Sequence, residues 1–280
     1  MDLTMKCIAV VIVTHNSGQV LSHCLTALEQ QSRRPDRVVI IDSGSRDTEY
    51  LKRTDVSTIK CVVILESNVG FSVGCNIGWN LSRDADFVLF LNPDAFLTPR
   101  FIEDALQYMK EDAGKKVGML TGTLLGYDIH LDRPTGLVDS TGVMHTWYGQ
   151  SIDRDQGKAI SVLEKYREPN PVPAICGAVL LARNSVLSAI AEKNVLFDPD
   201  YFMYKEDIDL SWKAIRAGWT LVHHPGLTVY HCRGWKGRHA VSRKMRMLSA
   251  RNDIKLFVRF GSPYLIYALV KYGMVWAFDL

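Results

Sequence analysis

The apolar run Phe87–Leu91, followed at once by Asn92-Pro93-Asp94, is the feature that most constrains the fold. A continuous run of β-branched, aromatic and aliphatic residues is typical of a strand buried on both faces of a parallel sheet. Such a strand delivers Asp94 to the carboxyl edge of the sheet, where ligands of open α/β sheets bind. A carboxylate there is a suitable ligand for Mg²⁺ or Mn²⁺. A simpler interpretation, compatible with the first, is a strand followed by a helix with Thr98 as N-cap and Pro99 at its first position.

Strand-like and helix-like segments alternate through the first 125 residues, which predicts an α/β fold with a mostly parallel sheet flanked by helices. The predicted strands of this half are Ile8–Val13, Arg37–Ile41, Cys61–Leu65, Phe87–Leu91 and Val117–Leu120, and the helices are Gln19–Gln31, Thr48–Arg53, Gly70–Leu81 and Pro99–Glu111. The second half predicts turns and a short hairpin over 126–172, strands at Ile175–Ala182, Thr220–His223 and Leu227–His231, and helices at Glu206–Ala217 and Ser242–Phe260.

Composition indicates a globular protein with a sizeable core, since the chain has 280 residues of which 47% are hydrophobic and 22% charged. A formal net charge of +3 argues against nucleic acid as a partner. The positive charge is nevertheless concentrated in one segment, because residues 231–260 hold nine Lys or Arg and a single acid, Asp253. This basic stretch, with the aromatic segment Tyr264–Phe278 behind it, is either a solvated face or a patch for an anionic membrane surface.

The six cysteines form no C-x-x-C pair and mostly lie in apolar runs, which favours reduced, buried thiols over disulfides or a zinc site. The sequence before the first strand has no signal-peptide layout, and no apolar stretch reaches the roughly 18–20 residues of a spanning helix. We therefore expect a cytoplasmic protein, with the C-terminal segment available for peripheral contact at the inner face of the cell membrane.

Small polar or acidic residues follow the first four predicted strands. These exits read Thr14-His15-Asn16-Ser17-Gly18, Asp42-Ser43-Gly44-Ser45, Glu66-Ser67-Asn68-Val69-Gly70 and Asn92-Pro93-Asp94. Because parallel strands end at one edge, four such exits predict a polar ligand lying across that edge. No G-x-G-x-x-G follows the first strand and no G-x-x-x-x-G-K-[ST] occurs, which argues against a dinucleotide fingerprint and a P-loop ATPase.

The ordered set of motifs T-H-N-S, I-I-D-S-G-S-x-D, N-x-G-F-x-x-G-x-N, F-L-N-P-D-A and F-M-Y-K-E-D-I-D-L-S-W-K resembles the family 2 inverting glycosyltransferases. Within them, the set is most similar to the rhamnosyltransferase-like branch that builds bacterial surface polysaccharides. The resemblance spans about residues 7–232 and implies a GT-A fold, a nucleotide-sugar donor and Mg²⁺ or Mn²⁺. It implies a catalytic domain over 1–232, with a nucleotide-binding half over 1–125 and an acceptor half over 126–232. Residues 233–280 would form a basic loop and a helical segment.

The resemblance assigns the nucleotide pocket to the first three strand exits. Thr14 and Asn16 would line the pocket, Asp42 would take the base or ribose, and Asn68 and Gly70 would border it.

Asn92 and Asp94 stand where the family has its D-x-D, and the first acid is here an amide. Asn92 can still hydrogen-bond ribose or sugar hydroxyls, but it is a poorer metal ligand than Asp. The resemblance makes Asp94 the main carboxylate on the metal and His231 a second ligand. The alternative for His231 is a structural histidine of the core.

Aromatic side chains next to carboxylates, as in the segment 197–207, suit the faces and hydroxyls of a sugar. By resemblance, Asp207 is the base that takes the proton of the acceptor hydroxyl, and Glu206 positions it or binds an acceptor hydroxyl. We expect Asp209 to serve helix structure.

Gly177 would let a sugar approach the backbone, unless it is simply a glycine in a buried strand. Arg233 and Trp235 would belong to a loop that closes over the diphosphate, where positive charge stabilises the leaving nucleotide; the alternative is a solvated basic loop.

The function expected from the resemblance is transfer of a sugar, by preference L-rhamnose from dTDP-β-L-rhamnose, onto a hydroxyl of a glycan or lipid-linked oligosaccharide. UDP-hexoses and UDP-N-acetylhexosamines remain open as donors. Two other classes also remain open. A nucleotidyltransferase usually has a Gly-rich basic loop after its first strand, which Thr14–Ser17 is not. A non-catalytic sugar-binding or scaffold protein is kept open by Asn92.

Overall fold

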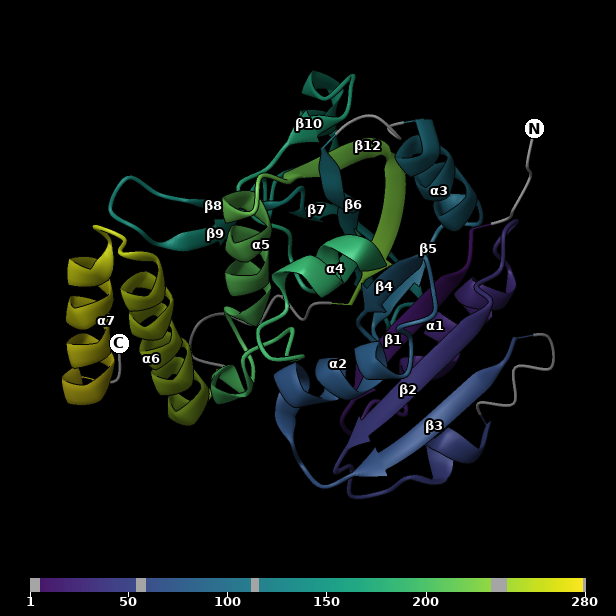
Figure 1. The fold of residues 1–280 in the computed structure, drawn as a ribbon, viewed down its shortest axis with the longest axis horizontal. Helices are drawn as coiled ribbons and strands as arrows, with labels where there is room; N and C mark the ends of the chain where they lie inside the picture. Colours follow the sequence, from purple (N-terminus) through teal and green to yellow (C-terminus); the bar gives the residue numbers. More distant parts are fainter. Residues whose placement is uncertain (1–5, 54–58, 112–115, 233–240, 279–280) are drawn as a thin grey trace.

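The computed structural model describes residues 6–53, 59–111, 116–232 and 241–278, and Figure 1 shows a central sheet with helices on both faces. The main strands are β1 (Ile8–Thr14), β2 (Arg37–Ser43), β3 (Cys61–Glu66), β4 (Phe87–Leu91), β6 (Val117–Asp128), β10 (Asn170–Pro171), β11 (Val179–Arg183) and β12 (Thr220–His231). Their order is β10-β12-β6-β11-β4-β1-β2-β3. β1, β2, β3, β4, β6 and β12 share one direction, and β10 and β11 run the other way. The predicted α/β class with a mostly parallel sheet is confirmed.

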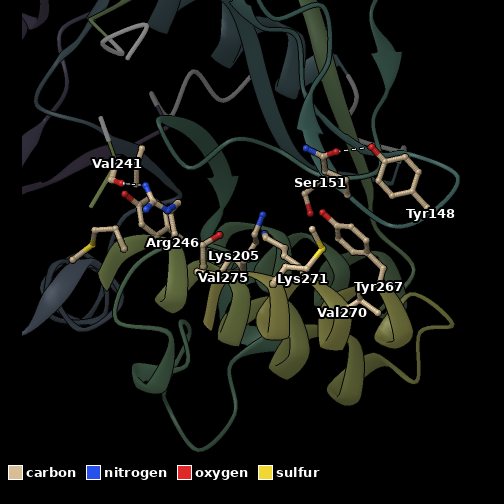
Figure 2. Close-up of a pocket in the computed structure, with 14 residues that line it drawn as sticks. Tyr148, Ser151, Lys205, Val241, Arg246, Tyr267, Val270, Lys271 and Val275 are labelled. Carbon is tan, nitrogen blue, oxygen red and sulfur yellow. Dashed lines mark hydrogen bonds between the residues drawn. The ribbon is translucent and has the colours of Figure 1, made fainter. Parts of the chain in front are cut away.

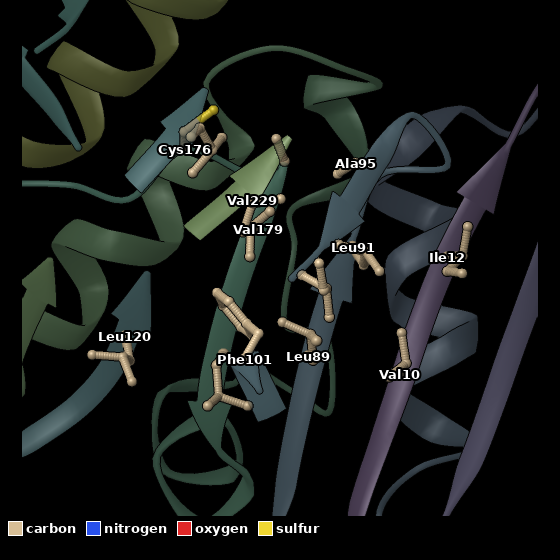
Figure 3. Close-up of a cluster of buried hydrophobic side chains, with 14 of the residues drawn as sticks. Val10, Ile12, Leu89, Leu91, Ala95, Phe101, Leu120, Cys176, Val179 and Val229 are labelled. Carbon is tan, nitrogen blue, oxygen red and sulfur yellow. The ribbon is translucent and has the colours of Figure 1, made fainter. Parts of the chain in front are cut away.

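Helices cover both faces of the sheet, which explains why β1 is buried along its whole length. They are α1 (Leu21–Glu29), α2 (Gly70–Asn80), α3 (Phe101–Glu111), α4 (Asn184–Ile190) and α5 (Glu206–Arg216). Val10 and Ile12 point into the core shared with α1 and α3, part of which Figure 3 shows. Val11 and Val13 point into the opposite core, shared with α2, α4 and α5.

A close contact between α2 and β1 accounts for Gly74 of the N-x-G-F-x-x-G-x-N motif and for Gly78, two residues beyond the motif. A Cβ on Gly74 would lie 2.8 Å from Val13 Cγ1, and one on Gly78 would overlap Val11. The final Asn76 of the motif is buried, donates to the Phe197 carbonyl (2.6 Å) and accepts from the Phe197 amide (2.9 Å). The motif therefore fixes α2 against β1 and ties it to the segment that precedes α5.

The C-terminal helices α6 (Arg243–Phe260) and α7 (Leu265–Phe278) pack against each other beside the sheet domain (Figure 1). Aromatic rings join them to the short hairpin β8 (Val143–His145) and β9 (Ser151–Asp153) and to α5. The His145 ring stacks on Tyr264 at 5.9 Å and lies 5.1 Å from Trp212. Burial lowers the pKa of His145 to about 4, so this histidine serves the cluster as a neutral ring. No helix in the described ranges is long and apolar enough to cross a bilayer.

Several boundaries differ from the sequence predictions. The helix predicted from Pro99 with Thr98 as its N-cap begins instead at Phe101, and an unpredicted short strand, β5 (Ala95–Leu97), precedes Thr98. Thr98 donates its hydroxyl to the Thr228 carbonyl (2.9 Å) instead of capping a helix. β5 forms because its apolar residues pair with the outer half of β12.

The strand predicted from Ile175 begins at Val179, and α4 and β7 (Arg133–Ser140) were not predicted. The two predicted strands Thr220–His223 and Leu227–His231 are one strand, β12, with an irregularity between His223 and Thr228. Pro225 and Gly226 interrupt the ladder there without ending the strand. Of the cysteines expected to be buried, Cys24, Cys75 and Cys176 are, whereas Cys7, Cys61 and Cys232 are partly exposed.

Candidate functional site

The strand exits border one cavity of about 610 Å³ at the carboxyl edge of the sheet, here called the strand-edge cavity. Six of the predicted ligand-binding residues line it: Thr14, Asn16, Asn68, Gly70, Asn92 and Asp94. These six residues come from three strand exits, and Ser43 of the remaining exit also lines the cavity. Gly70 lies at the start of α2 with φ +79°, and its N–H donates to Ser43 Oγ (3.0 Å).

Asp42 lies beneath this cavity and is not among its lining residues. Its carboxylate accepts hydrogen bonds from the Ser45 amide (2.9 Å), the Tyr50 hydroxyl (2.8 Å) and the Thr14 hydroxyl (3.2 Å). Burial alone would raise the pKa of Asp42, but these hydrogen bonds outweigh it and hold the pKa below its usual value. In this conformation Asp42 orders the two loops that border the cavity.

Asp94, which lines this cavity, begins a chain of side chains that continues through His231 to Asp139. His231 Nε2 lies 3.3 Å from Asp94 Oδ1, and His231 Nδ1 lies 2.7 Å from Asp139 Oδ2. His231 and Asp139 are buried, whereas the Asp94 side chain is 28% exposed. Burial would lower the pKa of His231, but the two carboxylates outweigh it and raise the pKa to about 9.

This chain suits a divalent cation held by Asp94 and His231. A carboxylate behind the second ring nitrogen is the usual device that fixes the tautomer of a metal-ligating histidine and aims its free nitrogen at the metal. Asp139 holds Nδ1, which leaves Nε2 facing Asp94. Among the described residues no group of three His, Cys, Asp or Glu is arranged to hold a metal. Phosphate oxygens and water would therefore have to complete the coordination, as is usual for Mg²⁺.

A second cavity of about 650 Å³, here called the carboxylate cavity, adjoins the first and shares Phe71, Asn92, Asp94 and Met203 with it. Glu206 and Asp207, at the start of α5, line it. The Asp207 carboxylate accepts from the Gly177 amide (2.9 Å) and from the Ile208 amide (2.8 Å). Gly177 thus comes close to Asp207, since a Cβ on it would lie 3.2 Å from Asp207 Cβ.

The two adjacent carboxyl groups differ in their surroundings. Glu206 is buried, and its Oε2 has no hydrogen-bond partner in the described part of the chain. Burial, together with the negative charge of Asp207, raises the pKa of Glu206 to about 8. Burial also raises the pKa of Asp207, but its two backbone hydrogen bonds favour the ionised form. At neutral pH we therefore assign the proton to Glu206 and the charge to Asp207, which makes Asp207 a proton acceptor.

A strained turn over residues 202–205 directly precedes Glu206 and Asp207, which line the carboxylate cavity. Phe202, Tyr204 and Lys205 all have positive φ (61°, 71° and 74°), a backbone conformation that residues other than glycine rarely adopt. The Nδ2 of Asn252, a fully buried residue of α6, donates to the carbonyls of Tyr201, Met203 and Tyr204, each at 2.9 Å. One side-chain amide from a helix about 50 residues away in sequence thus contacts three carbonyls of the turn.

Three residues at this site were missed by the sequence analysis: Asp139, Lys205 and Asn252. Asp139 follows the apolar pair Leu137-Val138, a weak signal of a buried acid in a strand; Lys205 lies in the F-M-Y-K-E-D motif but was given no role, and Asn252 gave no signal. Asp209, expected to serve helix structure, is buried and pairs with Lys213 (2.8 Å). Arg233 and Trp235 lie outside the described residues, so their assignment to a closing loop stays a prediction.

Two family sequence models match the chain: glycosyl transferase family 2 over residues 9–118, and glycosyl transferase family group 2 over residues 87–277. An N-acetylglucosaminyl-diphospho-decaprenol L-rhamnosyltransferase of Mycobacterium tuberculosis is 27% identical over 238 residues, which are 79% of this chain and 75% of that protein. An O-antigen chain rhamnosyltransferase of Salmonella typhimurium is 32% identical over 90 residues, which are 32% of this chain and 29% of that protein.

Solved structures share the architecture. GalNAc-T7, crystallised with UDP, GalNAc and Mn²⁺, gives a TM-score of 0.72 at 18% identity over 99% of this chain, which spans about half of that protein (52%). A mannosyltransferase from Pyrobaculum calidifontis, solved with GDP-Man and Mn²⁺, gives a TM-score of 0.61 at 14% identity over 99% of this chain and 72% of that one. At these identities the likeness concerns the fold, and it confirms the predicted GT-A architecture.

Proposed function

Because this chain belongs to glycosyl transferase family 2 and is a glycosyltransferase, we propose that it moves a sugar with inversion from a nucleotide donor to an acceptor hydroxyl. One observation carries this proposal: the strand-edge cavity and the carboxylate cavity meet at Asn92 and Asp94. A donor in the first cavity would therefore present its sugar to an acceptor in the second. Inversion needs a base on the face of the sugar opposite the leaving group, and Asp207 lines the second cavity only.

The nucleotide diphosphate is proposed to lie in the strand-edge cavity, with Thr14, Asn16, Asn68 and Gly70 around the nucleoside. Asp94 and His231 would hold Mg²⁺ or Mn²⁺, which when bound neutralises the charge that develops on the leaving diphosphate. The Mn²⁺ in the titles of two structural neighbours supports a divalent metal. Asn92, next to Asp94 in both cavities, would hydrogen-bond a ribose or sugar hydroxyl.

Asp207 is proposed to accept the proton of the attacking hydroxyl. Its backbone hydrogen bonds from Gly177 and Ile208 hold the carboxylate in place, and burial raises its pKa, which makes it a stronger base. Glu206, protonated at neutral pH, would donate a hydrogen bond to the acceptor or to Asp207.

L-Rhamnose from dTDP-rhamnose is the preferred donor, supported by the names of the two rhamnosyltransferase relatives. UDP-hexoses and UDP-N-acetylhexosamines are the alternatives within the same chemistry. The acceptor would be a glycan or a lipid-linked oligosaccharide of a bacterial surface polysaccharide, as the same relatives suggest.

Peripheral contact with the membrane is the proposed role of the outer face of α7. Ile266, Leu269 and Trp276 are 53–74% exposed there, and the exposed Arg243 and Lys244 begin the adjacent α6. Apolar and basic side chains together suit an anionic leaflet. Co-sedimentation with vesicles should rise with the anionic lipid content and fall with added salt; binding that ignores both would contradict this role.

Donor binding and transfer are tested separately on one variant, Asp207→Asn. Thermal shifts with dTDP-rhamnose, UDP-glucose, UDP-galactose, UDP-N-acetylglucosamine and GDP-mannose, each with and without Mn²⁺, identify the nucleotide. Asp207→Asn should keep the shift of the wild type and lose transfer by about 10²–10⁴-fold. Asp200→Asn, an exposed acid near the turn, is the matched control and should behave as wild type. Near-normal turnover of Asp207→Asn, or no shift with any nucleotide sugar, would overturn the proposal.

A further inference from the structure

A third cavity of about 530 Å³, here called the helical groove, lies between α6 and α7 on one side and the hairpin turn 148–151 on the other. Figure 2 shows Lys205 and Lys271 near its middle, Arg246 toward one end, and Tyr148 and Tyr267 at the other. None of the residues assigned above to the donor, the metal or the base lines this groove. It therefore has room for a part of a ligand that the reacting groups do not contact.

The groove is positively charged. Lys205, Arg246 and Lys271 line it, and none of the described residues that line it is an Asp or Glu. Below the groove Asp253, 2% exposed, pairs with Lys271 (2.5 Å) and Lys205 (3.4 Å). The described lining therefore carries three cationic side chains and no acidic one, as an anionic ligand group requires.

The groove is also apolar along α7. Val270, Met274 and Val275 line it, and the first two are 56% and 43% exposed. Tyr267 of α7 contacts Tyr148 of the hairpin at 5.4 Å, and the neighbouring Trp147 is 88% exposed. A hydrocarbon chain leaving the basic part of the groove would thus run over apolar side chains toward the surface.

The groove opens into the carboxylate cavity. The two share Ser151, Tyr204, Lys205, Val241 and Ser249. Lys205 directly precedes Glu206, so a ligand group at Lys205 lies next to the catalytic pair. A basic, apolar groove that is continuous with the proposed acceptor site suits one extended molecule better than two separate ligands.

We propose that the helical groove binds the phosphate and the first part of the hydrocarbon chain of a lipid-linked acceptor. The phosphate groups pair with Lys205, Arg246 and Lys271, the chain lies along Val270 and Met274, and the sugar extends to Asp207. This proposal rests on the proposed function and adds the class of acceptor and the residues that select it.

The test uses farnesyl diphosphate as a soluble probe below its micelle concentration, in EDTA so that the Asp94–His231 pair cannot capture it through a metal. Farnesol and inorganic pyrophosphate are the comparison ligands. Calorimetry should show farnesyl diphosphate binding at least about tenfold more tightly than either, because charge pairing and apolar burial both contribute. A benzophenone-bearing farnesyl diphosphate should cross-link to residues 267–275.

Matched variants separate the groove from the outer face of α7. Val270→Asp and Leu269→Asp change adjacent residues of similar exposure (56% and 53%), of which only Val270 lines the groove. Val270→Asp should lower the affinity for farnesyl diphosphate by about tenfold, and Leu269→Asp should lower it by less than about twofold. Likewise Arg246→Gln should weaken it, whereas Lys244→Gln, an exposed cation of α6 outside the groove, should not.

Equal effects of the paired variants, or cross-links outside 267–275, would overturn the proposal and leave α7 as a bilayer contact only. Nucleotide-sugar thermal shifts on the same samples show which idea has failed. If nucleotide sugars bind and the probe does not, the groove assignment is wrong and the transferase proposal stands. If the probe binds and no nucleotide sugar does, the donor assignment is wrong instead.

Discussion

Replacing Asn252 with alanine tests the idea that one buried amide stabilises the strained turn before the proposed catalytic pair, Glu206 and Asp207. Three residues of this turn have positive φ without being glycine, which costs on the order of 1–3 kcal/mol each. The amide of Asn252 donates to three carbonyls of the turn. The amide has two N–H groups to share among the three carbonyls, and each hydrogen bond contributes about 0.5–1.5 kcal/mol net, so the variant should lose about 1–3 kcal/mol of unfolding free energy.

The functional consequence is larger than the loss of stability suggests. Without Asn252 the turn loses contacts that offset its backbone strain, so we expect it to relax and to release Lys205, Glu206 and Asp207 from their positions. Hydrogen exchange of amides 202–208 should become faster, and transfer should fall by at least about tenfold below the melting temperature.

Arg251→Ala is the matched control, because the exposed Arg251 also donates from α6 to a nearby carbonyl, that of Asp200 (2.8 Å). We expect it to cost less than about 0.5 kcal/mol and to leave exchange unchanged. A loss below about 1 kcal/mol for Asn252→Ala, with unaltered exchange over 202–208, would refute the reasoning.

Three further predictions concern single groups. Gly70→Ala should cost about 2–4 kcal/mol by chemical denaturation, because its Cβ would lie 2.7 Å from the Phe202 carbonyl oxygen at a positive φ; Gly261→Ala, at φ +60° in open space, should cost only about 1 kcal/mol. Because the pKa of Glu206 is raised to about 8 in the folded state, unfolding free energy should fall as pH rises from about 4.5 toward 8, by up to about 1.4 kcal/mol per pH unit; Glu206→Gln should remove this slope, and an unchanged slope would disprove the assignment. Asp94→Asn should abolish the Mn²⁺-dependent part of the donor thermal shift, and its persistence would place the metal elsewhere.

The strands of the nucleotide half could be predicted from the sequence because both faces are buried. Burial on two sides produces continuous apolar runs such as Ile8–Val13, and these need no knowledge of the partner strand. β5 could not be found this way, since three residues carry too little pattern and its pairing with β12 is a tertiary contact.

The site divides in the same way. Asp94, Glu206 and Asp207 stand out because each lies beside a strong local pattern, a strand exit or a helix start. Asp139 contacts His231, which is 92 positions away in the sequence, and Asn252 contacts a turn about 50 positions away. Only the folded chain therefore reveals these two residues. Hydrogen bonds between residues so far apart in sequence leave no local periodicity, which is why these supporting residues escaped prediction while the proposed reacting groups stood out.

Helix α6 forms a common wall of all three cavities, since Met245 borders the strand-edge cavity and the helical groove, and Ser249 borders the groove and the carboxylate cavity. A displacement of α6 would therefore change the space available to both substrates at once. Thermodynamic linkage then requires the effect to be reciprocal. If a ligand in the groove changes the donor affinity by some factor, a bound donor changes the affinity of the groove for its ligand by the same factor. The two binding constants of this enzyme are consequently properties of the pair of ligands, and each has a meaning only with the occupancy of the other stated.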